Sequence, residues 1–138
     1  MVRRRAANRR EWWGERLAED RIRQGDIFWL DGCRPLQGEV AKRRPVIVVT
    51  PTEMAEAMTE VLVVACTTSV LASDKTAIEL PNRDQTPQTK TGLSRRTWAI
   101  PRWLLPVQRD LLTDYIGYLS GATLRRLLAA IEGSSTGD

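Results

Sequence analysis

The chain has 138 residues, of which 42% are hydrophobic and 28% are charged, a composition typical of one soluble globular domain. Its formal charge of +4 comes from residues 1–24, which hold eight arginines against four acidic residues, whereas the remaining 114 residues are balanced. The chain contains no histidine, which excludes the Ser-His-Asp triad, histidine-bound zinc and two-histidine ribonuclease chemistry.

The first predicted element is an amphipathic helix over residues 9–22. Asn8 can cap it, and Glu11 stands three residues further on, at the spacing of a capping box. We interpret residues 1–23 as an Arg-rich helical extension outside the main domain. Its two open roles are packing of its tryptophans onto the domain, which we favour, and contact with nucleic acid.

The main domain is predicted over residues 24–133, with 134–138 as a polar tail. β-Branched and aromatic runs indicate the first strands, and alternation indicates the later ones. The expected strands are 26–30, 46–50, 61–65, 76–80, 97–100 with a continuation near 103–105, and 115–119. One or two helical turns are expected within 52–58, and the polar stretch 81–92 is expected to be a long loop.

A last helix is predicted over residues 121–132, with Ser120 as its cap and Gly133 as its stop. Many short strands and one well-defined helix indicate a mainly β fold with minor α. We therefore expect an SH3-like small barrel or coiled sheet with a C-terminal helix and an N-terminal helical extension.

The two cysteines, Cys33 and Cys66, are far apart in sequence and show no CxxC spacing. Free thiols in a reducing cytosol are the expected state, so we predict a cytoplasmic protein. No apolar run approaches the roughly 20 residues of a membrane span, and no secretory signal follows the basic N-terminus. No membrane association is expected.

Two segments of the main domain are rich in basic residues. Residues 34–44 carry four basic side chains against Glu39, and residues 83–109 carry six against Asp84. This segregation can create a positive face that attracts a polyanion, or it can place solvated charges on separate surfaces. The sequence leaves both interpretations open.

Several short motifs, in their order and spacing, resemble the MazF/PemK family of toxins from type II toxin–antitoxin systems. The motifs are Gly25-Asp26-Ile27-Phe28-Trp29-Leu30, Gly38-Glu39, Arg44-Pro45-Val46-Ile47-Val48-Val49, Ala65-Cys66-Thr67-Thr68-Ser69, Gly92-Leu93 and Ile116-Gly117-Tyr118-Leu119-Ser120. The resemblance covers about residues 24–132. It implies a homodimeric, metal-independent and cofactor-free endoribonuclease that cleaves single-stranded RNA at specific sequences. It also implies inhibition by a cognate antitoxin protein.

The resemblance also implies roles for individual residues. Arg44 and Thr67 match the family's catalytic arginine and threonine, and Glu39 matches a supporting or substrate-orienting position. The candidate RNA-binding residues are Lys42, Arg43, Thr68, Ser69, Arg95, Arg96 and Arg102.

Ordinary structural roles are the alternative for these residues. Arg44 can be a solvated residue at the start of a strand, and the hydroxyls of Thr67, Thr68 and Ser69 can satisfy local backbone groups. Trp29 is expected in the core, and core or dimer packing is favoured over base stacking for Trp98 and Trp103.

The chain departs from the family pattern at Pro101-Arg102, where many members have Asp-Gln. Two other functions stay open beside RNA cleavage. One is a toxin of the same fold that acts by binding DNA gyrase, and the other is a catalytically silent RNA-binding regulator. The general base and the recognised RNA sequence are not assigned by the sequence.

Overall fold

A computed structural model describes residues 22–36, 38–69 and 75–136 of the chain. The helix expected over residues 9–22 lies almost wholly outside these ranges. The strands are β1 (Asp26–Cys33), β2 (Lys42–Val48), β3 (Glu60–Thr67), β4 (Ile78–Leu80), β5 (Thr97–Gln108) and β6 (Asp114–Tyr118). The helices are α2 (Thr52–Ala55), a 3₁₀ turn η2 (Arg109–Leu111) and α3 (Gly121–Thr136).

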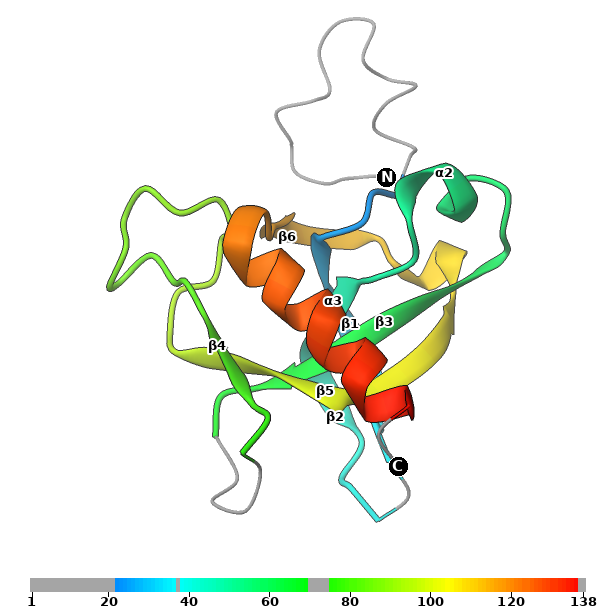
Figure 1. Cartoon of the computed structure of the whole chain (residues 1–138), viewed down its shortest axis with the longest axis horizontal. Coiled ribbons are helices and arrows are strands. Elements are labelled where there is room, and N and C mark those ends of the chain that lie inside the picture. The colour runs from blue at the N-terminus through cyan, green and yellow to red at the C-terminus, as the bar shows by residue number, and fades with distance from the viewer. Residues whose placement is uncertain (1–21, 37, 70–74, 137–138) are drawn as a thin grey trace, which may run out of the picture.

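The strands form one curled, antiparallel sheet in the order β4-β5-β3-β2-β1-β6. The long helix α3 crosses one face of this sheet, and α2 lies at its periphery (Figure 1). The prediction of a mainly β, barrel-like sheet with a C-terminal helix is confirmed.

Side chains that alternate along the central strands fill two cores, one on each face of the sheet. Phe28, Val46 and Val63 pack with Trp103 on the curled inner face. Ile27, Ile47 and Val64, the neighbours of those residues in the chain, pack with Leu127 of α3 on the other face. Because the middle of each of β1 to β3 is covered on both faces, the runs 27–30, 46–48 and 63–66 are continuously apolar.

Several predicted boundaries were wrong. β2 begins four residues earlier than expected, so Arg44 and Pro45 lie inside a strand. Pro45 is tolerated there because it is paired with Trp29 of β1, while the ladder to β3 begins only at Val46.

Strand β5 is continuous, although two separate strands were expected on either side of Pro101. The register between β3 and β5 shifts between Val64 and Cys66, and the residues around Pro101 lie in this irregular stretch. A proline is compatible with such a stretch, because no regular ladder hydrogen bond is required of it.

Helix α3 extends beyond the predicted stop at Gly133 and reaches Thr136. Gly133 does not have the positive φ of a terminating glycine, so it is simply a residue of the helix. Among the described residues, neither helix has the length and hydropathy that a bilayer-spanning segment needs.

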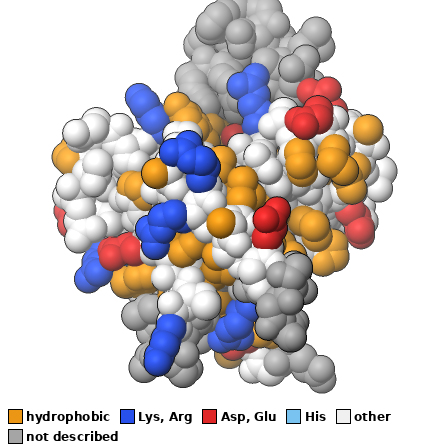
Figure 2. Space-filling view, in the orientation of Figure 1, with side chains coloured by type: hydrophobic (Ala, Val, Ile, Leu, Met, Phe, Trp, Pro, Cys, Tyr) orange, Lys and Arg blue, Asp and Glu red, His pale blue; other side chains and the backbone are white. Residues whose placement is uncertain are grey.

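Hydrophobic side chains gather on the surface over α2 and the neighbouring ends of β3 and β5 (Figure 2). Met54, Met58, Leu62 and Leu111 are the large exposed side chains of this region.

Candidate functional site

A cleft of about 460 Å³ opens where β2 begins and β3 ends. The ladder between these strands pairs Val46 with Ala65, so its register, continued by two residues, brings Arg44 opposite Thr67. Both residues line the cleft. The other lining residues are Trp29, Lys42, Arg43, Pro45, Cys66, Thr68, Arg83, Gly92, Leu93, Ser94, Arg95 and Thr97.

Arg44 is a buried cation, with only 4% of its surface exposed. Its guanidinium carbon lies 5.0 Å from the ring centroid of Trp103, and Nη2 donates a hydrogen bond to the Val40 carbonyl at 3.1 Å. The Nε atom is buried and has no partner among the described residues. An unsatisfied donor on a buried charge costs free energy, and an anion in the cleft would recover it.

Thr67 is also largely buried, with 7% exposed. Its hydroxyl accepts a hydrogen bond from the Ser69 amide at 3.1 Å and donates one to the Ser69 carbonyl at 3.2 Å. The local turn chemistry that the sequence left open is therefore present. Because donation to a carbonyl two residues away is weak, this hydroxyl can turn toward an anion in the cleft.

The cleft is lined by a cation that has carboxylate partners and by cations that have none among the described residues. Lys42, Arg83 and Arg95 are exposed lining residues, and none of them forms an ion pair with a described residue. Arg43 also lines the cleft, but it bridges Asp31 and Asp114 and lies over the Trp29 ring. The hydrogen bond to Asp31 is the main reason why the pKa of Arg43 is raised.

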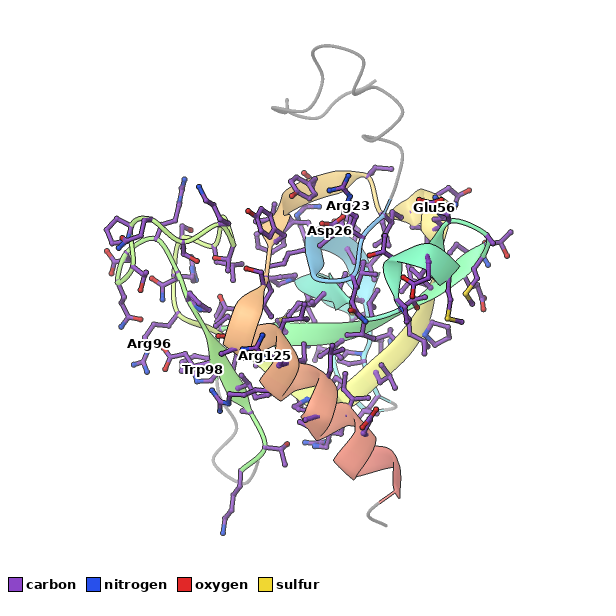
Figure 3. The ribbon with its side chains drawn as sticks, turned by 45° about the horizontal axis from the view of Figure 1, so that its top comes forward. Arg23, Asp26, Glu56, Arg96, Trp98 and Arg125 are labelled. Atoms are coloured by element: carbon purple, nitrogen blue, oxygen red, sulfur yellow. The ribbon has the colours of Figure 1, made fainter. Side chains whose placement is uncertain are left out.

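The pair of Arg96 and Trp98 lies away from the cleft, at the β4 side of the sheet (Figure 3). Arg96 forms two hydrogen bonds to Glu79, at 2.7 and 3.0 Å, and its guanidinium lies over the Trp98 ring. These hydrogen bonds lower the pKa of Glu79. Arg96 is therefore engaged within the protein.

The model of the PemK-like, MazF-like toxins of type II toxin–antitoxin systems matches residues 23–134. The chain belongs to this family. A search among curated proteins finds no match.

Solved structures of MazF toxins share the fold. MazF from Deinococcus radiodurans superposes with a TM-score of 0.65 at 16% identity, covering 86% of this chain and 98% of that one. The Mycobacterium tuberculosis toxin MazF-mt6 superposes with a TM-score of 0.60 at 22% identity, covering 81% of this chain and 96% of that one. A mycobacterial endoribonuclease in complex with its cognate antitoxin superposes with a TM-score of 0.58 at 17% identity, covering 84% of this chain and 93% of that one.

Not every candidate site residue from the sequence lies at the cleft of this MazF-like domain. Glu39, Ser69, Arg96 and Arg102 are not among its lining residues. Glu39 lies in the loop between β1 and β2, where its amide donates to the Leu36 carbonyl. Its catalytic role stays a prediction. Arg102 is exposed within β5, beside buried Pro101.

Trp29 and Arg83 line this MazF-like cleft, but the sequence did not single out either of them as a site residue. Trp29 was expected in the core, but it is half-buried and faces the cleft. Arg83 was noticed only as part of a basic segment. The signal that could have singled it out is its place just after the β4 strand, in a loop that returns to the cleft.

The two cysteines are free thiols, and both are buried. Burial raises the pKa of the Cys33 thiol, and the nearby Arg44 opposes this shift in part. Among the described residues of this MazF-like domain, no group of three or more Cys, Asp or Glu side chains is placed to bind a metal ion.

Proposed function

We propose that this chain is an endoribonuclease toxin that cleaves single-stranded RNA without a metal ion and is neutralised by a cognate antitoxin. The observation that supports it is the shared cleft of Arg44 and Thr67, a buried guanidinium and an alcohol on neighbouring strands. Membership in the toxin family and the endoribonuclease named among its structural neighbours support the same activity.

The proposed reaction is transfer of the phosphoryl group to the adjacent ribose. The 2′-oxygen forms a bond to phosphorus, the bond from phosphorus to the 5′-oxygen breaks, and the 2′-hydroxyl proton is released. The 5′-oxygen takes up a proton. The products are a 2′,3′-cyclic phosphate and a 5′-hydroxyl end.

Arg44 is proposed to stabilise the charge that develops on the phosphoryl oxygens. Its guanidinium offers hydrogen-bond donors in a fixed fork that matches two phosphoryl oxygens. Burial beside the Trp103 ring keeps it oriented before RNA arrives, so little reorganisation is needed during the reaction. Thr67 is proposed to donate a hydrogen bond to the same phosphate.

Removal of the 2′-hydroxyl proton is assigned to water or to Glu39. No carboxylate is among the described residues that line the cleft, so Glu39 would have to approach from the loop between β1 and β2. A Glu39→Gln variant separates the two possibilities, since it slows the reaction only if this carboxylate takes the proton.

The free cations of the cleft are complementary to an antitoxin as well as to RNA. Two neighbouring structures contain a MazE–MazF complex and an endoribonuclease with its cognate antitoxin. We infer that an extended acidic segment of the antitoxin occupies the cleft and competes with RNA. The exposed Met54, Leu62 and Leu111 support a homodimer, because they would be covered by a second copy.

The test is incubation of the purified protein with a long single-stranded RNA in the presence of a metal chelator, followed by analysis of the new ends. The expected ends are a 2′,3′-cyclic phosphate and a 5′-hydroxyl, and RNA with 2′-deoxyribose at the cleaved position is expected to stay intact. Intact RNA together with inhibited DNA gyrase would contradict the proposal and support the gyrase-binding alternative.

A further inference from the structure

The loop between β4 and β5 forms one wall of the cleft and is tied together internally. Asn82 is fully buried, and its side-chain oxygen accepts hydrogen bonds from the Asp84 and Gln85 amides, both at 3.0 Å. The Arg83 amide donates to the Leu93 carbonyl at 2.8 Å, closing the loop at its base. Arg83 is therefore held by a network in which its own side chain takes no part.

The same loop is fixed to the opposite edge of the sheet. The Tyr118 amide of β6 donates to the Lys90 carbonyl at 2.9 Å. Gly92 of the loop and Gly117 of β6 let these two backbone segments come into contact, because neither residue has a Cβ. A Cβ on Gly92 would lie 2.1 Å from the Ile116 oxygen, and a Cβ on Gly117 would lie 2.3 Å from the Lys90 oxygen. The wall is thus preformed, which limits the entropy lost when a ligand binds to it.

Two exposed arginines extend from this wall. Arg83 and Arg95 both line the cleft, and neither forms an ion pair with a described residue. The neighbouring Asp84 is engaged through its backbone with Asn82 and makes no described ion pair with Arg83. By contrast, Arg43 and Arg96 are each neutralised by carboxylates.

We propose that Arg83, together with Arg95, binds a phosphate of the RNA next to the one that is cleaved. This inference rests on the proposed function and adds a substrate-binding residue that the sequence did not single out. Arg44 and Thr67 occupy the strand side of the cleft, whereas Arg83 and Arg95 approach from the loop side. A strand of RNA that places one phosphate at Arg44 then passes its neighbour along the loop wall. Arginine suits this role, because its fork can bind two phosphate oxygens at once.

The test measures binding of a non-cleavable oligonucleotide, RNA with 2′-deoxyribose at the cleaved position, at several salt concentrations. Each phosphate contact on a single strand contributes about −0.7 to the slope of log K against log salt. Arg83→Ala is expected to make that slope less steep by about 0.7 and to weaken binding roughly tenfold at low salt. Arg83→Lys is expected to keep most of the slope, because the charge remains.

Arg125→Ala is the matched control. Arg125 is an exposed arginine of α3 that does not line the cleft (Figure 3), and its loss changes the net charge by the same amount. It is expected to leave the slope unchanged. An equal change in Arg83→Ala and Arg125→Ala would overturn the inference, because it would reflect net charge alone.

The outcomes separate this inference from the proposed function. If the wild-type protein neither binds nor cleaves single-stranded RNA, both are wrong. If it cleaves RNA and Arg83→Ala has the wild-type slope and KM, the inference alone is wrong. A raised KM with little change in kcat is the expected kinetic signature, since the neighbouring phosphate is bound equally in the ground state and the transition state.

Discussion

The guanidinium of Arg44 stacks on the indole of Trp103, 5.0 Å from the ring centroid, inside the curled inner face of the sheet. A charge so far removed from water is costly unless its surroundings are polar or polarisable. The electron-rich face of the indole meets part of that need and sets the direction of the guanidinium. Catalysis at the cleft should therefore depend on the aromatic character of residue 103.

Trp103→Phe is expected to retain most of the RNA cleavage, because phenylalanine still presents a ring face to Arg44. It also removes the indole Nε1, which is buried and has no hydrogen-bond partner in the part of the chain that the structure describes, so the loss of stability is partly offset. Trp103→Leu is expected to lower the cleavage rate by about 10- to 30-fold, the equivalent of up to about 2 kcal/mol of cation–π interaction. The test compares the RNA cleavage rates of the two variants, after urea unfolding has shown that both are folded. Similar rates for the Phe and Leu variants would contradict the role of the ring.

Neutralisation of the carboxylates beside Arg43 is expected to strengthen RNA binding. Asp31 and Asp114 hold Arg43 at the edge of the cleft, so the double change of Asp31→Asn and Asp114→Asn frees one cation for a phosphate. The expected result is tighter binding to a non-cleavable oligonucleotide and a salt slope steeper by about 0.7.

The stability cost of that double change is expected to stay below about 1 kcal/mol for each pair, because all three side chains are exposed. Asp110→Asn, in the exposed turn η2, is the control for a change of charge away from the cleft. An unchanged slope in the double variant would mean that Arg43 stays with its present neighbours or does not reach the RNA.

Gly117→Ala is expected to lower the free energy of unfolding by more than about 3 kcal/mol. The new Cβ would lie 2.3 Å from the Lys90 oxygen and 2.5 Å from the Thr91 oxygen, so the β6 strand or the cleft wall must shift. Gly133→Ala is the control, because apart from the neighbouring helix backbone no described atom lies within 4 Å of the added Cβ. Alanine in place of glycine stabilises a helix by up to about 1 kcal/mol. Urea unfolding followed by tryptophan fluorescence measures both. A Gly117→Ala variant as stable as the wild type would show that the loop and β6 are not in tight contact.

Stability is expected to fall in alkaline solution because of Cys66. Burial raises the pKa of this thiol above its ordinary 9.0, and the neighbouring Cys33 adds to the shift. The folded state then holds its proton more tightly than the unfolded state does. The contribution to stability is complete below pH 9 and is lost above it at about 1.4 kcal/mol per pH unit.

The comparison with Cys66→Ala isolates this effect from other groups that titrate in the same range. The variant is expected to be less stable than the wild type at pH 7, because it leaves a small cavity, and to have a flatter profile between pH 9 and 10.5. Parallel profiles of the two proteins would contradict the assignment to Cys66.

The sequence predicted the central strands and the last helix because their apolar patterns have no competing interpretation. It failed at Pro101 and Gly133, where local preferences suggested a break. At Pro101 the register shift between β3 and β5 removes the need for a ladder hydrogen bond, and at Gly133 the helix continues in ordinary conformation. Both outcomes depend on neighbours that are distant in sequence.

The candidate site was only partly predictable, because its arrangement also depends on contacts between residues that are distant in sequence. Arg44 and Thr67 came from family resemblance, whereas their shared cleft depends on the register of β2 against β3. The pairing of Arg43 and Arg96 with carboxylates could not be foreseen, since Asp114 and Glu79 are far from them in sequence. Arg83 was hidden because only the folded loop brings it back to the cleft.

The decisive experiment is the single-turnover rate of RNA cleavage by the wild type, Arg44→Ala and Thr67→Val, with Arg125→Ala as the control. We expect a 10²- to 10³-fold loss for Arg44→Ala, a loss of at least about tenfold for Thr67→Val, and an unchanged rate for the control. Wild-type rates in both cleft variants, with all proteins folded, would contradict the claim that these two residues act together on one phosphate.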